Sequence, residues 1–432
     1  MGKVKQLGLL KNKMDLKQQL NEMGEKAKAA SAVLNTAPSI QKNSFFDFAI
    51  KEIKSDQELI LMANHQDVAQ ARDAGKDAAF IDRLELNQDR LEGICATLEE
   101  IKLFPDPVGK ILANWDRPNG LNISRVSTPL GVIGIIFESR PNVASDAGGL
   151  CLKSGNAVIL RSGKDGLRSA SALVTAMQKA LLKAGLPKES IQIVPSENRE
   201  AATLMLEGLN GSIDVIVPRG GKSLVAEVEK SAKVPVFGHL EGICHVYVDE
   251  HADLKKALEI CINAKMRRTG ICGAAETILL HQKIATSFGS DLIAKLSSLN
   301  CEVRGCKKTL ALDQYVIPAT EEDWSTEYLA PIISIKVVDD AEEAIRHINS
   351  YGTGHTESII SEDLNSQNQF TASIDSAIVM INTSTQFADG GEFGLGGEIG
   401  IATGKFHARG PVGLDQLTSF KYIVSGDGQI RL

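Results

Sequence analysis

The sequence has no apolar run approaching the roughly 20 residues that a membrane-spanning helix needs. Its first six residues, Met1 to Gln6, show no apolar core of a signal peptide and no serine or threonine at the sixth position, where N-myristoylation signals have one. The formal net charge is −7, so the chain has no general electrostatic attraction to nucleic acid or anionic membranes. We therefore expect a cytoplasmic protein with no nucleic-acid and no membrane partner.

A disulfide framework is also missing. Seven cysteines is an odd number, and a reducing compartment suits them. Cys301 and Cys306 have the spacing C-x4-C, but no pair of histidines or cysteines follows to complete a zinc set. The sequence therefore predicts no metal site.

The 432 residues are too many for one ordinary core and indicate two or three domains. Apolar residues at helical spacing predict helices over 14–104, and 121–130 is predicted to be extended. From 131 onward apolar strands alternate with helices. We expect strands at 132–137, 157–160, 191–194, 215–217, 234–237, 245–248, 277–280, 332–338, 377–381 and 417–424, with helices at 167–184, 199–207, 222–230, 253–268, 285–299 and 341–349. Apolar strands between helices are typical of parallel sheets covered on both faces, so the predicted class is α/β.

Cys272 is the candidate nucleophile. It follows a basic, helix-forming stretch that ends at Gly270, and it precedes an apolar run that is typical of a buried strand. Lys265, Arg267 and Arg268 lie just upstream, and nearby positive charge favours the reactive thiolate. A cysteine taken at random is more often a buried structural residue, but these neighbours favour a catalytic role.

The dinucleotide fingerprint G-x-G-x-x-G does not follow any predicted strand. Two other strand-to-helix turns can take its place. One carries Arg161 and Lys164 at the carboxyl end of a strand, where α/β sheets bind ligands. The other carries Gly220 and Gly221 before a helix, whose first N–H groups can face a pyrophosphate.

Several long segments, in this order, resemble the aldehyde dehydrogenase superfamily and, within it, the γ-glutamyl phosphate reductases. They are Asp106-Pro-Val-Gly109, Pro129-Leu-Gly-Val-Ile-Gly-Ile-Ile-Phe-Glu-Ser-Arg-Pro-Asn142, Leu150–Leu160, Cys244–Val248, the Cys272 segment and Phe387–Phe406. The resemblance implies two doubly wound α/β domains plus a β oligomerisation arm. It assigns 14–120 and 131–242 to an NADP(H)-binding domain, 243–381 to a catalytic domain, and 121–130 with 382–432 to the arm and a C-terminal loop. It also implies a homo-oligomer.

Carried over by position, the resemblance makes Cys272 the nucleophile and places Arg161 and Lys164 at the adenosine ribose. A lysine there favours the 2′-phosphate of NADP(H). The turn with Gly220 and Gly221 would cover the pyrophosphate, and Glu327 would hold the nicotinamide ribose, although a surface glutamate before a strand stays an alternative for Glu327.

The chain departs from ordinary aldehyde dehydrogenases in two ways. The asparagine that assists the oxyanion is replaced, with Ser139 at its position and Asn142 close by, so either could be a donor beside the Cys272 N–H. The glutamate that activates water has no match: His239 stands there, and Glu241 lies two residues on. Losing that base suits a reductase, which must protect its thioester from water.

The activity implied is NADPH-dependent reduction of γ-glutamyl phosphate to glutamate 5-semialdehyde, the second step from glutamate to proline, with glutamate kinase as a possible upstream partner. Candidates for binding the substrate phosphate are Arg267, Arg140 and Arg409. His245 and His281 are interpreted as structural. Another thioester-forming member, such as a CoA-acylating or ordinary aldehyde dehydrogenase, and a non-catalytic dinucleotide-binding protein remain as alternatives.

Overall fold

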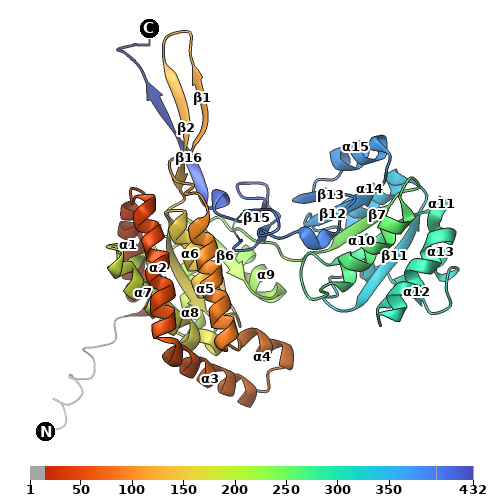
Figure 1. The fold of residues 1–432 in the computed structure, drawn as a ribbon, viewed down its shortest axis with the longest axis horizontal. Coiled ribbons are helices and arrows are strands. Elements are labelled where there is room, and N and C mark those ends of the chain that lie inside the picture. The colour runs from red at the N-terminus through yellow and green to blue at the C-terminus, as the bar shows by residue number, and fades with distance from the viewer. Residues whose placement is uncertain (1–14, 396, 432) are drawn as a thin grey trace. The chain divides into compact units, whose positions relative to one another are not determined.

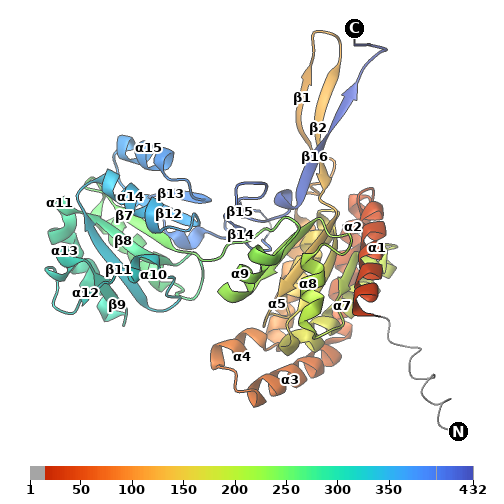
Figure 2. The same ribbon diagram turned by 180° about the vertical axis from the view of Figure 1, so that it is seen from behind.

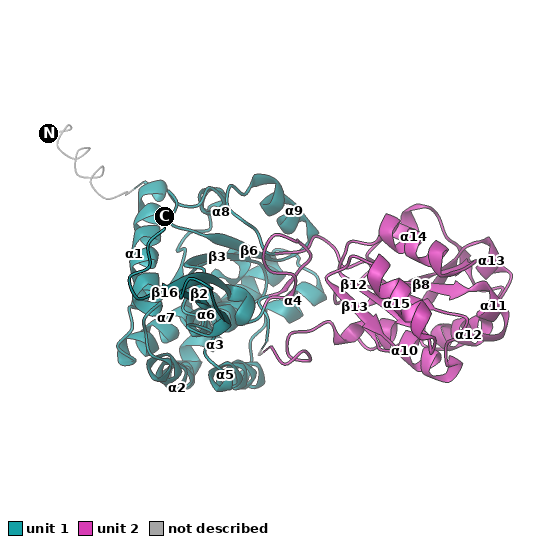
Figure 3. Ribbon diagram, turned by 90° about the horizontal axis from the view of Figure 1, so that it is seen from above, with its two compact units in different colours: residues 1–237, 396–399, 413–432 teal, residues 238–395, 400–412 magenta. Residues whose placement is uncertain are grey.

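The computed structural model describes residues 15–395 and 397–431. The described residues divide into two compact units, and Figure 3 colours them separately. Unit 1 comprises the described residues of 1–237, 396–399 and 413–432, and unit 2 comprises 238–395 and 400–412. Met14, the first residue of the predicted helical region, lies outside the described residues. None of the described helices is long and apolar enough to cross a membrane.

Unit 1 is built on a parallel sheet with the strand order β5-β4-β3-β6. The strands are β3 (Val132–Phe137), β4 (Ala157–Ser162), β5 (Ile191–Ile193) and β6 (Val215–Arg219). Helices α6 (Val143–Lys153) and α7 (Leu167–Lys183) pack on the sheet and on each other, while α1 (Leu16–Leu34), α8 (Arg199–Leu206) and α9 (Lys222–Ser231) form a second group (Figures 1 and 2). The sheet is therefore doubly wound, as predicted.

The remaining helices of unit 1 precede this sheet in sequence. They are α2 (Ser39–Ser55), α3 (Gln57–Asp73), α4 (Ala78–Leu84) and α5 (Gln88–Leu103). Two buried lysines tie α2 and α5 to α6, the helix that packs on the sheet. Lys42 forms an ion pair with Asp106 at 2.5 Å, and the Lys153 Nζ donates to Asn43 Oδ1 at 2.6 Å and to the Lys102 carbonyl at 2.8 Å. Asp106, one of the residues that carry the family resemblance, is thus a structural anchor.

The arm is a three-stranded antiparallel sheet in the order β1-β2-β16. Its strands are β1 (Ile111–Asp116), β2 (Asn122–Pro129) and β16 (Thr418–Ser425). The sequence predicted β2 and β16 but not β1, which is exposed at five of its six positions and has no buried face to give an apolar pattern.

Unit 2 contains a larger parallel sheet in the order β10-β9-β11-β8-β7-β12-β13. Its strands are β7 (Cys244–Val248), β8 (Ala275–His281), β9 (Glu302–Gly305), β10 (Ile317–Pro318), β11 (Ile332–Val338), β12 (Thr356–Ile360) and β13 (Ile378–Ile381). Helices α10 (Leu254–Met266) and α12 (Ser290–Ser298) contribute to one apolar core, and α14 (Ala341–Tyr351) and α15 (Leu364–Ser373) to another. Unit 2 also contains two short helices, α11 (Gln282–Ile284) and α13 (Lys307–Leu310). A hairpin is formed by β14 (Ile401–Ala402) and β15 (Gly410–Pro411).

Two predicted elements differ from the observed ones. The strand expected at 234–237 is reduced to one bridge between Ile216 and Val236, because Pro235 has no N–H to continue a ladder. The helix expected at 285–299 begins as a π-helix at Ala285–Gly289 and becomes α-helical only at Ser290. The second unit begins at Gly238, where the Thr403 N–H of the same unit donates to the Gly238 carbonyl.

Candidate active site

Cys272 lies in the loop between α10 and β8 of unit 2. Helix α10 begins after Asp253, whose carboxylate caps it by accepting from two backbone N–H groups, and it ends at Met266 with Arg267 as its C-cap. Of the seven cysteines, Cys272 and Cys306 are partly exposed and the other five are buried. Burial raises the pKa of buried thiols such as Cys244 and Cys151, so these stay protonated.

The backbone of the Cys272 loop is packed against Gly242. A Cβ at Gly242 would lie 2.2 Å from the Cys272 carbonyl oxygen and 2.7 Å from its Cα, so only glycine fits. The Gly242 N–H donates to Glu327 Oε1 at 2.9 Å, which fixes that glycine in turn. On the other side a Cβ at Gly273 would lie 3.1 Å from the Thr385 carbonyl. The loop therefore has little freedom to move.

Two imidazole rings lie beside the Cys272 thiol. One nitrogen each of His239 and His355 and the Cys272 Sγ all lie within 4.8 Å of one another. The two rings meet edge to face with centroids 4.8 Å apart. His239 Nδ1 contacts the Ile401 carbonyl at 2.7 Å; because a carbonyl only accepts, Nδ1 carries a hydrogen.

His355 is fully buried at the start of β12, and sequence reasoning missed it. Burial and the neighbouring His239 lower the pKa of His355 to about 3, so its ring is neutral at physiological pH. Its Nδ1 lies 2.9 Å from Thr356 Oγ1, while its Nε2 is buried without a hydrogen-bond partner among the described residues. The residues around His355 carry no chemical motif, and the strand that follows, Thr356–Ile360, is too polar to show an apolar pattern.

The basic residues near Cys272 in sequence differ in their environments. Lys265 is fully buried and paired with Glu276 at 2.5 Å, so its charge is largely compensated. Burial raises the pKa of Glu276 to about 7, and the ion pair with Lys265 opposes that shift. Arg267 is exposed and lines a pocket of about 310 Å³ together with Asn263, Asn382 and Gln386. Arg267 is therefore open to a ligand, whereas Lys265 is not.

The other two arginines predicted to bind the substrate phosphate lie elsewhere. Arg409 Nη1 forms an ion pair with Asp375 at 2.7 Å, and Nη2 donates to the Asp375 carbonyl, so much of its guanidinium is already engaged. Arg140 is exposed on unit 1, in the turn between β3 and α6.

Ser139 and Asn142, the predicted oxyanion donors, also belong to unit 1. Ser139 is buried and has a positive φ of 47°, a strained conformation that often marks functional turns. Asn142 precedes α6, and its Nδ2 donates to Asp146 Oδ2 at 2.8 Å. That bond orients the Asn142 amide and uses one of its two hydrogens.

The predicted cofactor-binding residues of unit 1 lie at the carboxyl ends of β4 and β6. Arg161 is the last but one residue of β4. Its Nε is buried and has no partner among the described residues, and burial lowers the pKa of Arg161. Lys164 is exposed and has no ion-pair partner in the described part of the chain. Gly220 packs against Glu138 and Leu224, whereas a Cβ at Gly221 would meet open space. Glu138 follows β3 directly, and its negative charge acts on Arg161. Glu327 belongs to unit 2, where its carboxylate accepts from Gly242.

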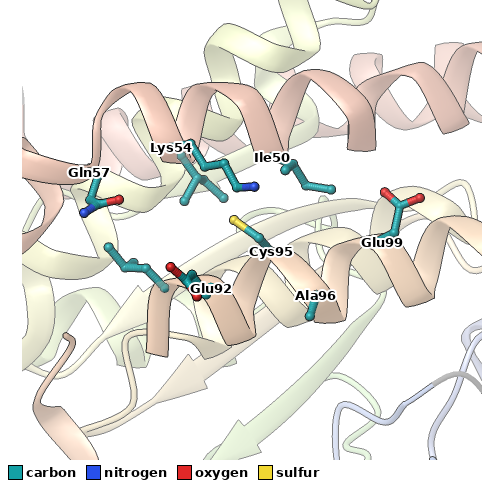
Figure 4. Close-up of a pocket in the computed structure, with 9 residues that line it drawn as sticks. Ile50, Lys54, Gln57, Glu92, Cys95, Ala96 and Glu99 are labelled. Atoms are coloured by element: carbon teal, nitrogen blue, oxygen red, sulfur yellow. The ribbon is translucent and has the colours of Figure 1, made fainter. Parts of the chain in front are cut away.

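A separate cavity of about 590 Å³ lies between α2 and α5 on unit 1 (Figure 4). Cys95 points into it opposite Lys54, and burial raises the pKa of the Cys95 thiol. None of the predicted site residues lines this cavity, so its thiol is no rival to Cys272.

The comparisons with known proteins fit this arrangement. The aldehyde dehydrogenase family model matches residues 10–309 and 316–423. The γ-glutamyl phosphate reductase of Brucella suis biovar 1 (strain 1330) is 56% identical over 417 residues, which cover 96% of this chain and 99% of the relative. The chain belongs to the aldehyde dehydrogenase family and, within it, to the γ-glutamyl phosphate reductases. It is therefore an oxidoreductase, and enzymes of this family use a nicotinamide cofactor.

Two further proteins agree with that membership. The γ-glutamyl phosphate reductase of Parvibaculum lavamentivorans is 54% identical over 420 residues, which cover 97% of this chain and 99% of the relative. The crystal structure of γ-glutamyl phosphate reductase from Thermotoga maritima is 44% identical, covers 96% of this chain and 100% of its own, and superposes with a TM-score of 0.94. Both the family and the fold predicted from the sequence are thus confirmed.

Proposed function

We propose that this chain reduces γ-glutamyl phosphate to glutamate 5-semialdehyde and phosphate, using NADPH, as the second step from glutamate to proline. The observation that carries the proposal is Cys272: a partly exposed thiol, on a loop fixed by Gly242 and Gly273, beside His239 and the neutral imidazole of His355. The relatives' shared name gives the substrate.

The first step is attack of the Cys272 thiolate on the acyl phosphate carbonyl. Because the His239 Nδ1–H is held by Ile401, the neutral form of this ring would carry its lone pair on Nε2 and would take the thiol proton there. A carbon–sulfur bond forms and phosphate leaves with the bonding pair, giving a thioester. The Cys272 backbone N–H, with Ser139 or Asn142, would stabilise the oxyanion.

The second step reduces the thioester and regenerates the thiol. The bound cofactor supplies the hydride. Cys272 then leaves as thiolate and takes its proton back from His239, and the aldehyde is released. Once His239 carries the thiol proton it cannot activate water, which protects the thioester from hydrolysis.

The residues of unit 1 fit a phosphorylated dinucleotide. The unpartnered Arg161 Nε and the exposed Lys164 provide positive charge at the end of β4, and the open space at Gly221 lets a pyrophosphate approach the first N–H groups of α9. Glu327 would hold the nicotinamide ribose, and Arg267, Arg140 and Arg409 remain candidates for the substrate phosphate. Unit 1 would then be the cofactor domain and unit 2 the catalytic domain.

We also propose that the arm joins copies of this chain. Large apolar side chains are exposed on it, namely Trp115, Phe420, Tyr422, Ile423 and Val424. Contiguous exposed apolar surface is typical of a protein interface. A cytoplasmic location and glutamate kinase as the upstream enzyme complete the proposal.

The reverse reaction tests the chemistry. Enzyme, glutamate 5-semialdehyde and NADP⁺ should form NADPH only when phosphate is added, and arsenate should replace phosphate. Coenzyme A should not replace it, and sulfate serves as the ionic-strength control. Rapid NADPH formation without phosphate would identify a hydrolytic aldehyde dehydrogenase, and formation only with coenzyme A would identify a CoA-acylating one.

A further inference from the structure

The Cys272 thiol and two histidines form a ligand set that the spacing of residues along the chain does not reveal. His239 precedes β7, Cys272 follows α10, and His355 precedes β12, so they lie far apart in sequence. In unit 2 they bring two imidazole nitrogens and one sulfur within 4.8 Å of one another.

Both histidines are arranged as metal-binding histidines usually are. Such a histidine binds the metal through one nitrogen, while a backbone carbonyl or another polar group holds the other nitrogen and fixes the ring. His239 Nδ1 is held by the Ile401 carbonyl at 2.7 Å, and His355 Nδ1 lies 2.9 Å from Thr356 Oγ1. In both rings the remaining nitrogen is Nε2.

An independent observation is the state of His355. Its side chain is fully buried, and its Nε2 has no hydrogen-bond partner among the described residues. A buried ring nitrogen without a partner is unfavourable, so a ligand that bonds to it would be stabilising.

We propose that His239, Cys272 and His355 bind one Zn²⁺ ion reversibly, and that the bound ion blocks the enzyme by occupying the thiol. Two histidines and one cysteine are the nitrogen and sulfur donors that zinc prefers, and three protein ligands leave a fourth position for water. Tetrahedral bonds at usual lengths need ligand atoms about 3.3 to 3.6 Å apart. The three ligand atoms lie within 4.8 Å of one another, so zinc binding requires them to approach by roughly 1 Å.

Binding forms two zinc–nitrogen bonds and one zinc–sulfur bond, breaks the Cys272 S–H bond, and releases that proton to the solvent. No electron is transferred, so a chelator reverses the reaction. Hard cations such as Mg²⁺ prefer oxygen ligands and are not expected to bind.

Equilibrium dialysis of the full-length enzyme against Zn²⁺ tests the site. We expect one zinc per chain in the wild type and in Cys306→Ser, which removes the other partly exposed thiol. Cys272→Ser should weaken zinc binding more than about 100-fold, since even outer-shell partners of a metal cost 10- to 100-fold. His355→Asn should weaken zinc binding by a similar factor. If His355→Asn does not fold, His239→Asn is measured in its place. Undiminished binding in Cys272→Ser would overturn the proposal.

Cobalt gives a spectroscopic readout that does not depend on activity. Co²⁺ bound at this site should produce a thiolate-to-cobalt charge-transfer band in the wild type and in Cys306→Ser but not in Cys272→Ser. The blocking effect rests on the proposed role of Cys272, whereas the binding does not. Stoichiometric zinc with full activity would overturn the blocking effect and the nucleophile assignment together and leave the metal site standing. Phosphate-dependent activity without any zinc binding would overturn only the proposed zinc site and would leave the proposed function standing.

Discussion

The Cys272 loop of unit 2 and the two ligand-binding turns of unit 1 are built in opposite ways. Around Cys272 the chain packs against itself: Gly242 and Gly273 each lie where a Cβ would meet backbone atoms. In unit 1 the turns leave space and charge unused: Gly221 faces open space, and Lys164 has no ion-pair partner among the described residues.

This difference indicates which substitutions should disturb the position of the thiol and which should weaken the binding of a ligand. Chemistry on a covalent intermediate needs the sulfur held to within a fraction of an ångström, so the protein fixes that loop itself. A cofactor brings its own phosphates and completes its site on binding, so the protein leaves the turns open. A change in the first region should lower kcat, and one in the second should raise a Michaelis constant.

The largest effect is expected from removing the thiol. Cys272→Ala should lower kcat at least about 1000-fold, a barrier increase of about 4 kcal/mol, because no thioester can form. NADPH binding and thermal stability should be unchanged. Steady-state kinetics of Cys272→Ala and of the control Cys306→Ala decide it: a Cys272→Ala rate above a tenth of the wild type would refute the nucleophile assignment.

A smaller loss should follow from disturbing the loop without touching the sulfur. In Gly242→Ala the new Cβ would lie 2.2 Å from the Cys272 carbonyl oxygen, and no flexible side chain can yield there. A displacement of about 1 Å can cost about 100-fold, so we expect kcat to fall about 10- to 100-fold, with the KM for NADPH little changed.

Gly270→Ala is the matched control in the same loop, because a Cβ at Gly270 meets no atom within 4 Å. It should keep kcat within about twofold of the wild type. Equal losses in both variants would mean that the close packing on Gly242 is not what positions the thiol.

The sequence predicted most of the α/β architecture because buried strands such as β3 and β11 are continuous apolar runs. It missed β12, whose five residues include two threonine or serine hydroxyls and Glu357, a buried carboxylate that pairs with His245 at 2.9 Å. A buried strand with polar residues shows no apolar pattern in the sequence. The histidine that pairs with Glu357 lies 112 residues away, so no local motif indicates the pair either.

The candidate site was predictable only where one segment carries the chemistry. Cys272 and the turns with Lys164 and Gly221 could be found from their neighbours in sequence. His355 and the contact between Gly242 and Cys272 could not, because both depend on which strands are adjacent in the sheet. For the same reason, Lys265 is close to Cys272 in sequence but is paired with Glu276 in the fold.

In unit 1, Lys164→Glu should reduce the difference between the Michaelis constants for NADPH and NADH. Charge-assisted bonds to phosphate contribute about 1.5 to 3 kcal/mol each, so losing one should raise the KM for NADPH about 10- to 100-fold. NADH has no 2′-phosphate and should be unaffected or improved. The test measures both Michaelis constants on Lys164→Glu. The control is Lys188→Glu, which changes an exposed lysine of the same unit. An unchanged ratio of the two constants would remove Lys164 from the cofactor site.

The smallest effect is expected at Gly221, where the protein itself places no atom near a new Cβ. Gly221 has φ −71° and ψ 168°, which alanine adopts without strain, so Gly221→Ala should fold normally. If a pyrophosphate approaches the first N–H groups of α9, the added methyl group should hinder it and raise the KM for NADPH about three- to tenfold. The control is Gly93→Ala, inside α5 and equally open, which should leave the KM unchanged and stabilise the fold by about 0.5 to 1 kcal/mol. A KM for NADPH that stays at the wild-type value in Gly221→Ala would mean that the space at this turn is not used by the cofactor.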